Sequence, residues 1–196
     1  MTHANILAIQ AGLMSVTEFT SSDRTLSYLP LAHVAERSII WYLLFKGGCF
    51  CVISGEKAPK YIKDDLEDCK PTVFLSVPRL YNKFYDKINA KLSGTFKKLG
   101  DKHFKPLTTF MNKLFEKALK RKEKRMLDNN CYKHWVYDKL FFDKVKMILG
   151  GNVRLMITGA APINDDVKQF FKLAAGCRMH EAYGQTECTG ISHTTD

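Results

Sequence analysis

A threonine and a glutamate close behind a glycine form the most chemically suggestive group in the sequence. The octet YGQTECTG, at 183–190, follows a β-prone stretch at 177–183. Gly184 predicts a tight turn with positive φ, a conformation that a Cβ would penalise. The Thr186 hydroxyl can hydrogen-bond an anion, and the Glu187 carboxylate suits a hard cation such as Mg²⁺. This spacing predicts a site for a metal-bound phosphate, and the alternative is a glycine turn with solvated polar side chains.

A second candidate site is a run of small residues, Gly159, Ala160, Ala161 and Pro162, which follows an apolar stretch at 153–158. The apolar stretch predicts a buried strand. In an open α/β sheet, ligands bind just beyond the carboxyl ends of the strands, and small residues there let a flat ligand approach the backbone. Pro162 and the acidic residues after it also fit the start of a helix. The two interpretations are compatible.

His33 lies at the start of another predicted helix. A strand at 25–29 is ended by Pro30, which cannot donate to a β-ladder. The helix then runs to Lys46, and two glycines at 47–48 end it. By default a lone histidine in this position is a core residue, and the alternative is a place beside a substrate pocket.

The order of the predicted elements indicates the fold class. The apolar run at 49–54 predicts a strand buried on both faces, as in a parallel sheet. A predicted helix at 59–70, a strand at 72–77 and a helix opened by Pro78 follow. This alternation predicts an α/β fold with a mostly parallel, doubly wound sheet and flanking helices. An amino-terminal helix over 1–19 carries no capping signal at its start.

Five segments carry a family resemblance: MTHANIL, LPLAHVAER, VPRLY, LGGNVRLMITGAAP and YGQTEC. Their order and approximate spacing resemble those of long-chain fatty-acyl-CoA synthetases, which are adenylate-forming, AMP-binding enzymes. The resemblance covers essentially the whole chain and implies part of the large N-terminal domain of such a ligase. It implies ATP, Mg²⁺ and coenzyme A as cofactors and co-substrate. The implied substrate is a long-chain fatty acid, activated to acyl-AMP and then joined to coenzyme A as a thioester.

The resemblance also implies roles for individual residues. Thr186 and Glu187 are the implied catalytic pair, with Thr186 on the phosphate of the adenylate and Glu187 holding Mg²⁺. Tyr183 would lie by the adenine, and His33 would border the acyl-substrate pocket. The implied nucleotide-binding residues are Gly159, Ala160, Ala161, Pro162, Tyr183, Gly184, Gln185 and Thr186.

The positive charge of the chain belongs to one segment. The net charge is +10, and positions 81–146 hold 18 Lys and Arg against 7 Asp and Glu. We expect a basic, mostly helical excursion at 84–142, whose densest stretch begins at Lys113 and ends at Arg125. The default interpretation is a solvated helix face, and contact with an anionic membrane is the alternative. No nucleic acid is expected, because no recognised nucleic-acid motif accompanies the charge.

Composition also bears on location. The sequence has no run of about 20 apolar residues that would span a membrane. Its start lacks the order of a signal peptide. The six cysteines are scattered, which favours reduced thiols. We therefore expect a place on the cytoplasmic side, peripheral to the endoplasmic reticulum or another membrane.

Three parts of a whole family member are not found in the sequence. They are the phosphate loop rich in glycine, serine and threonine, the aspartate motif for the ribose, and the small C-terminal domain with its adenylation lysine. We therefore expect residues 1–196 to form a partial AMP-binding domain that is inactive alone. Two alternatives remain: an adenylating enzyme for another carboxylic acid, and a catalytically inactive homologue that binds acyl-CoA or a membrane.

Overall fold

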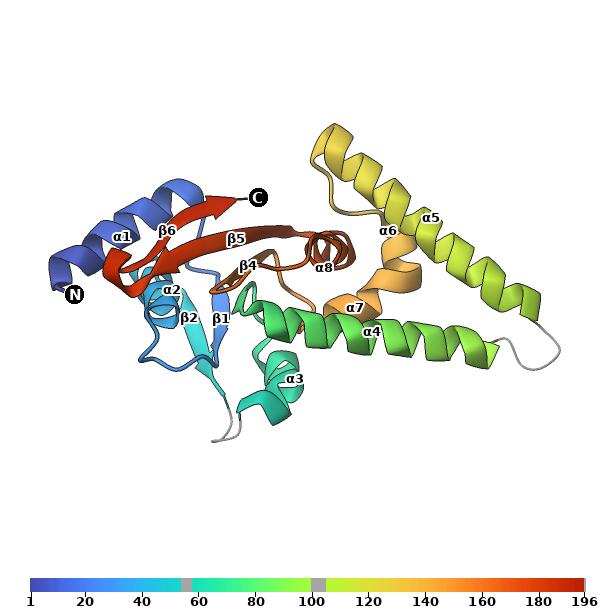
Figure 1. The fold of residues 1–196 in the computed structure, drawn as a ribbon, viewed down its shortest axis with the longest axis horizontal. Coiled ribbons are helices and arrows are strands. Elements are labelled where there is room, and N and C mark those ends of the chain that lie inside the picture. Colours follow the sequence, from blue (N-terminus) through green and yellow to red (C-terminus); the bar gives the residue numbers. More distant parts are fainter. Residues whose placement is uncertain (54–57, 100–104, 196) are drawn as a thin grey trace.

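The main sheet has four strands in the order β3-β4-β5-β6. The computed structural model describes the backbone of residues 1–53, 58–99 and 105–195, and side chains at 1–53, 61–91 and 110–195. β3 (Val73–Ser76), β4 (Leu155–Gly159) and β5 (Arg178–Gln185) run parallel, and β6 (Gly190–Thr195) is antiparallel to β5. This arrangement, visible in Figure 1, confirms the predicted α/β fold with a mostly parallel sheet.

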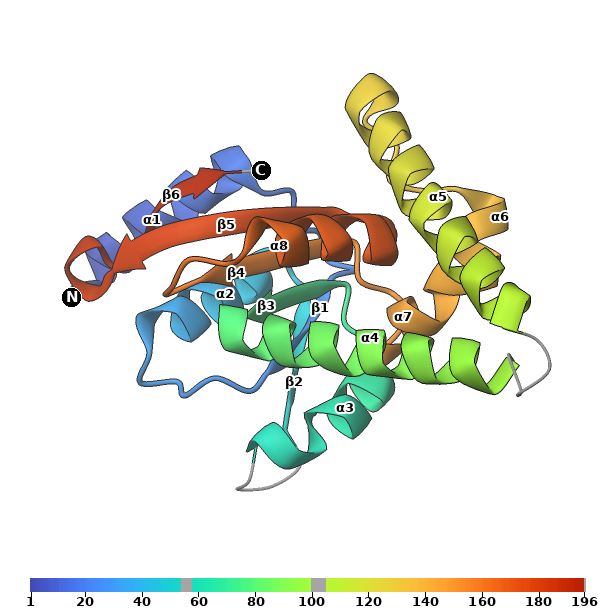
Figure 2. The same cartoon turned by 45° about the vertical axis from the view of Figure 1, so that its right-hand side comes forward.

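Helices cover both faces of this sheet because its buried residues alternate between them. On one face Leu75 and Ile157 belong to a cluster with residues of α1 (His3–Val16) and α2 (Val34–Phe45). On the other face Phe74 and Met156 pack in a cluster with residues of α4 (Pro78–Leu99) and α8 (Asp165–Phe171). Figure 2 shows α4 and α8 together on that side of the sheet. The strands are therefore buried on both sides, as the prediction of a doubly wound sheet requires.

The amino-terminal helix does carry a capping signal, contrary to the sequence-based expectation. Thr2 caps α1 by accepting from the Asn5 backbone, and the Asn5 side chain accepts in return from the Thr2 backbone. Asn takes the place of the usual Glu or Gln in this capping box, which is why the pattern was missed. The other helices are α3 (Ala58–Cys69), α4 (Pro78–Leu99), α5 (Lys105–Asn129), α6 (Trp135–Tyr137), α7 (Asp143–Ile148) and α8 (Asp165–Phe171).

A separate two-stranded parallel sheet is formed by β1 (Arg24–Ser27) and β2 (Cys49–Val52). The expectation that the apolar run at 49–54 is buried on both faces is wrong: Val52 is 71% exposed and Phe50 is 36% exposed. Among the described residues β2 has β1 as its one neighbouring strand, so its apolar run lies at an edge. The end of the predicted strand, residue 54, and the predicted turn at Gly55 lie outside the described residues.

The basic run on α5 is not uniformly solvated. Most of its lysines and arginines are exposed, but Lys122 is 0% exposed and its Nζ lies 2.5 Å from the Asp138 Oδ1. Asp138 belongs to a π-helical segment, η1 (Asp138–Phe142), which joins α6 to α7. Burial raises the pKa of Asp138, but the hydrogen bond and charge of Lys122 outweigh it and hold the pKa below its usual value. The default interpretation of a solvated face therefore fails at Lys122, which ties α5 to the rest of the fold.

Candidate active site

The octet at 183–190 forms the hairpin between β5 and β6. A 3₁₀ turn, η3 (Thr186–Cys188), ends at Thr189 with a φ of 63°, and Gly190 follows with a φ of 122°. Gly184 is not among the residues with positive φ, so the predicted reason for this glycine is wrong. A Cβ on Gly184 would overlap the Gly190 carbonyl oxygen. The glycine is required because the main chain of β6 passes too close for a side chain, and the positive φ of the turn falls at Thr189, five residues later.

The hairpin is fastened to α2. The Ser38 hydroxyl lies 3.3 Å from the Thr189 carbonyl oxygen and 2.9 Å from the Val34 carbonyl oxygen, within donating distance of both. A Cβ on Gly190 would stand 2.8 Å from the Ser38 Oγ, so a side chain there would push the two elements apart. The start of α2 and the 3₁₀ turn are thereby held at a fixed separation.

A cavity of about 290 Å³ opens between these elements at the carboxyl ends of β3, β4 and β5. This is the edge at which open α/β sheets bind ligands. The cavity brings together six of the residues predicted for the site, which come from three separate parts of the chain: His33, Gly159, Ala160, Gly184, Gln185 and Thr186.

Four predicted residues do not line this cavity. Ala161 and Pro162 are exposed beyond the end of β4. Tyr183 is 65% exposed, and its ring centroid lies 6.2 Å from that of His193 on β6. Glu187 faces a different hollow of about 570 Å³, beside α1. The structure therefore does not bring Glu187 into the same cavity as Thr186.

His33 is exposed rather than buried in the core, so the default interpretation is wrong in this respect. Its Nδ1 accepts from the Ala35 backbone N–H at 3.2 Å and thereby caps α2. The cap fixes the imidazole at the mouth of the cavity, which is consistent with a place beside a substrate pocket. Ala160, which also lines the cavity, has a φ of 68°. Such left-handed conformations of residues other than glycine often accompany functional sites.

Sequence reasoning missed a polar network behind the cavity. The Tyr28 hydroxyl lies 2.7 Å from the Oγ of Ser76, a residue that lines the cavity. Burial raises the pKa of Tyr28 to about 12, so the phenol keeps its proton. Glu36, in the first turn of α2, is 3% exposed. Burial raises the pKa of Glu36 to about 7, although hydrogen bonds from Ser27 and the Tyr28 backbone oppose the shift. The sequence signal for this carboxyl was an acidic residue at a position in α2 that faces the core.

We expect Glu36→Gln to raise the free energy of unfolding near pH 8. The pKa of Glu36 is about 7 in the folded chain against an ordinary value of 4.5. Between these values the folded chain binds more protons than the unfolded chain, so stability falls as pH rises. The full effect corresponds to about 3 kcal/mol above pH 7. Urea titrations of both proteins at pH 5 and pH 8 measure it, and an equal pH dependence in the two would contradict the assignment.

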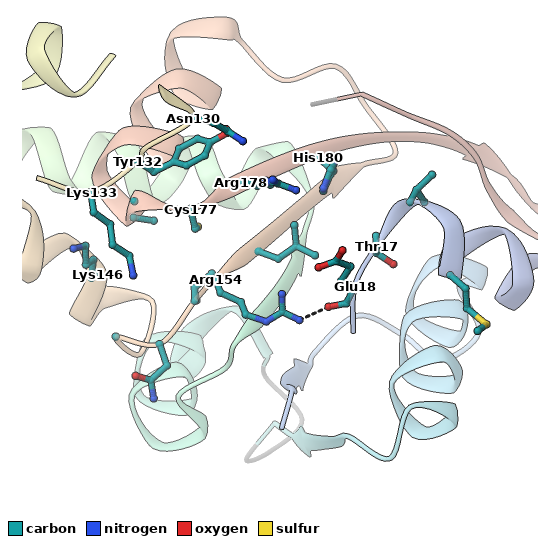
Figure 3. A pocket seen from close by; sticks show the side chains of 18 of the residues that line it. Thr17, Glu18, Asn130, Tyr132, Lys133, Lys146, Arg154, Cys177, Arg178 and His180 are labelled. Carbon is teal, nitrogen blue, oxygen red and sulfur yellow. Dashed lines mark hydrogen bonds between the residues drawn. The ribbon is translucent and has the colours of Figure 1, made fainter. Parts of the chain in front are cut away.

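A larger hollow of about 890 Å³ lies at the amino ends of β4 and β5. Figure 3 shows Lys133, Lys146, Arg178 and His180 around it, and Arg154 reaching toward Glu18. Two of its cations are already occupied, because Arg154 pairs with Asp23 and Lys146 pairs with Asp138. It contains none of the predicted site residues and lies at the edge of the sheet opposite to the one that binds ligands in such folds. The smaller cavity is therefore the candidate active site.

The side chains around the 3₁₀ turn limit what could hold a metal. Within the described part of the chain, no three His, Cys, Asp or Glu side chains gather in a metal-binding group. Glu187 is an exposed carboxylate on this turn, next to Thr186. Mg²⁺ is commonly bound through one or two carboxylates together with substrate phosphates and waters. A single carboxylate therefore fits an ion that arrives with a nucleotide, and does not fit a permanently bound ion.

Comparison with known proteins identifies a family that matches the whole chain. The AMP-binding enzyme family matches residues 1–196. Long-chain-fatty-acid–CoA ligase 5 of Mus musculus is 40% identical over 194 residues, which cover 97% of this chain and 26% of that protein. The peroxisomal long chain acyl-CoA synthetase 7 of Arabidopsis thaliana is 36% identical over 198 residues, with 100% and 26% coverage. The chain thus spans about a quarter of the length of these relatives.

Solved structures show the same fold. The adenylation domain of a carboxylic acid reductase from Segniliparus rugosus, in complex with AMP and a carboxylic acid, has a TM-score of 0.62 at 19% identity, covering 95% of this chain and 25% of that one. A long-chain-fatty-acid–CoA ligase from Archaeoglobus fulgidus has a TM-score of 0.56 at 19% identity, covering 99% and 30%. The likeness of fold agrees with the sequence match over all 196 residues. The chain belongs to the AMP-binding enzyme family.

Proposed function

We propose that this chain forms part of a ligase that activates a long-chain fatty acid with ATP and joins it to coenzyme A. The observation that carries the proposal is the cavity at the carboxyl ends of the parallel strands. Thr186, the small residues Gly159 and Ala160, and His33 all line it. The curated relatives named above are long-chain-fatty-acid–CoA ligases and synthetases, which supports a long-chain fatty acid as the substrate.

In the proposed reaction, a carboxylate oxygen of the fatty acid attacks the α-phosphorus of ATP, and pyrophosphate leaves. The thiol of coenzyme A then attacks the carbonyl carbon of the acyl-AMP, and AMP leaves. The first step brings two anions together, so its barrier is lowered by donors and cations placed where charge develops.

Each proposed site residue has a part in this reaction. Thr186 donates a hydrogen bond to the phosphate, and the backbone at 159–162 and 183–185 accommodates the adenosine and the acyl end. His33 borders the acyl chain. The position of these residues around one cavity supports the roles of His33, Gly159, Ala160, Gly184, Gln185 and Thr186. The roles of Ala161, Pro162 and Tyr183 rest on the sequence resemblance.

Glu187 is the proposed holder of Mg²⁺, which neutralises phosphate charge when it is bound. Glu187 lies on the same 3₁₀ turn as Thr186 but faces the neighbouring hollow beside α1. A nucleotide whose phosphates extend over the 3₁₀ turn would contact the Thr186 hydroxyl in the cavity and the Glu187 carboxylate in the neighbouring hollow. The exposure of Glu187 supports this proposal because an exposed carboxylate can turn toward an ion bound to the phosphates.

Fatty-acid-dependent exchange of pyrophosphate into ATP tests the function. We expect exchange with long-chain fatty acids in the natural polypeptide that carries this chain, and much less with aryl and short-chain acids. Exchange confined to an aryl or short-chain acid would favour an adenylating enzyme for that acid. If no carboxylic acid supports exchange, the binding-protein alternative becomes the better explanation.

We also propose a peripheral contact with an anionic membrane through the stretch from Lys113 to Arg125, on the cytoplasmic side of the endoplasmic reticulum or another organelle. Five basic side chains on α5 share one open surface with a single carboxylate: Lys113, Lys117, Lys120, Arg121, Lys124 and Glu116. Such a surface attracts anionic lipid headgroups at about 1 kcal/mol per Lys or Arg. In the described part of the chain, no helix is both long enough and apolar enough to cross a bilayer.

A further inference from the structure

Three cysteines gather where α3 meets the two-stranded sheet of β1 and β2. Cys49 and Cys51 belong to β2 and stand two positions apart, so both side chains point to the same face of that sheet. Cys69 is the last residue of α3. The three differ in their access to solvent, because Cys49 is exposed, Cys51 is half-buried and Cys69 is buried. We call these three residues the thiol cluster.

The contacts of β1 place Cys69 over the face to which Cys51 points. Leu26 is the register partner of Cys51, and paired residues of neighbouring strands point to the same face. Leu26 and Cys69 belong to one core cluster, and Cys51 packs against it. Arg24, two positions before Leu26, donates from its Nη1 to the Cys69 carbonyl oxygen at 3.0 Å. The Cys69 Sγ itself lies 3.6 Å from the Thr25 carbonyl oxygen, and Figure 2 shows α3 beside β2.

The thiols of Cys51 and Cys69 are hydrogen-bonded to each other. Burial raises the pKa of the Cys69 thiol, and the hydrogen bond with Cys51 raises it further. A disulfide requires two cysteine side chains that point toward one another, and two thiols in hydrogen-bond contact meet this requirement. Metal binding is the other chemistry of clustered thiols, but no metal-binding group of three His, Cys, Asp or Glu side chains occurs among the described residues. The arrangement of the thiol cluster therefore suits oxidation.

We propose that Cys51 and Cys69 form a reversible disulfide when the folded protein meets hydrogen peroxide, and that this bond ties α3 to β2. Cys51 reacts first, because it is the more accessible of the two and the buried Cys69 keeps its proton. The proposal concerns a part of the fold outside the candidate active site and does not rest on the proposed ligase reaction.

The proposed oxidation has two steps. The Cys51 thiolate attacks one oxygen of the peroxide, the O–O bond breaks, and the departing hydroxide takes up a proton to become water. Cys51 is then a sulfenic acid. The Cys69 sulfur attacks the Cys51 sulfur, the S–O bond breaks, and the Cys69 proton leaves with the oxygen in a second water. The two thiols together lose two electrons, which the peroxide gains.

The test is peptide mapping of the natural polypeptide that carries this chain, after brief exposure of the folded protein to hydrogen peroxide. Free thiols are blocked with iodoacetamide, and the protein is digested with trypsin without a reductant. We expect the peptides of Cys51 and Cys69 to be linked, with a mass about 2 Da below the sum of the two reduced peptides. Dithiothreitol should release both. Absence of the link at a peroxide concentration that oxidises the exposed Cys188 would overturn the proposal.

Cys49→Ser and Cys51→Ser are a matched pair of variants, since both residues point to one face of β2 and share one tryptic peptide. We expect Cys49→Ser to keep the link to Cys69 and Cys51→Ser to lose it. A link that survives in Cys51→Ser and disappears in Cys49→Ser would contradict the assigned pair. Fragmentation of the linked wild-type peptide gives the same assignment without a substitution, so the test does not depend on the folding of either variant. No nucleotide or fatty acid is present, so failure of this proposal and failure of the ligase proposal are distinguishable.

Discussion

Glu187→Gln is expected to slow formation of the acyl-adenylate by about 10²–10³-fold in the natural polypeptide that carries this chain. The substitution keeps the shape of the side chain and removes the charge proposed to hold Mg²⁺ beside the phosphates. Glu187 is exposed on a short 3₁₀ turn, so the exchange should leave the fold unchanged. Because the charge acts on the ion, the Mg²⁺ concentration needed for half-maximal rate should also rise.

The measurement is pyrophosphate exchange against Mg²⁺ concentration, at saturating ATP and fatty acid. Cys188→Ala is the matched control, because Cys188 is exposed on the same turn and no role in the reaction is proposed for it. The control should stay within about twofold of the wild type. Undiminished exchange by the Gln variant at saturating ATP and Mg²⁺ would remove Glu187 from the metal site.

Lys122→Ala is expected to lower the free energy of unfolding by about 3–5 kcal/mol, the usual cost of leaving one member of a buried ion pair alone. Asp138 loses the partner at 2.5 Å and keeps Lys146 at 3.2 Å, a lysine that is itself partly exposed. The Lys122 ammonium also lies 4.6 Å from the centre of the Phe142 ring, and that contact disappears as well.

Urea unfolding followed by circular dichroism measures the change as a lower midpoint at an unchanged slope. Lys120→Ala and Lys124→Ala are matched controls, since both lysines are exposed on the same helix. Each should change stability by no more than about 0.5 kcal/mol. A loss shared equally by all three variants would show that the basic run as a whole, rather than the buried pair, sets the stability.

The sequence predicts where helices begin because the residues at those positions determine the ends of a helix. Pro78 does open α4, and His33 does stand at the start of α2. The small residues after β4 lie at the ligand-binding edge of the sheet because every parallel strand of a doubly wound sheet ends there. The family resemblance supplied the chemistry, which periodicity and composition could not.

The errors concern contacts between residues far apart in the sequence. The apolar run of β2 indicates a strand but says nothing about a second neighbouring strand, so its exposure could not be predicted. Lys122 belongs to a run of charges that predicts a solvated face, and its burial depends on Asp138 sixteen residues away. The sequence predicts a turn at Gly184, whereas the close approach of Gly184 to Gly190 can be seen only once the hairpin is known.

Neighbouring residues in the site motif were also expected to act in one place. In a 3₁₀ turn each residue is rotated by about 120° from the previous one, so adjacent side chains point in different directions. Thr186 consequently lines the cavity while Glu187 faces the hollow beside α1. The residue types of the site can be read from the sequence, but the direction in which each side chain faces cannot.

At Gly184 the main chain of β5 lies directly against the main chain of Gly190, with no room for a side chain between them. The position of the turn therefore depends on main-chain contact at Gly184, and on the Ser38 side chain of α2 at Gly190. An exposed neighbour such as Cys188 is free to vary in the course of evolution without displacing Thr186. A residue larger than glycine at 184 would meet the Gly190 carbonyl oxygen, and one at 190 would meet the Ser38 hydroxyl. Either substitution would move the turn, so we expect substitutions to be tolerated at the exposed neighbours and not at the two glycines.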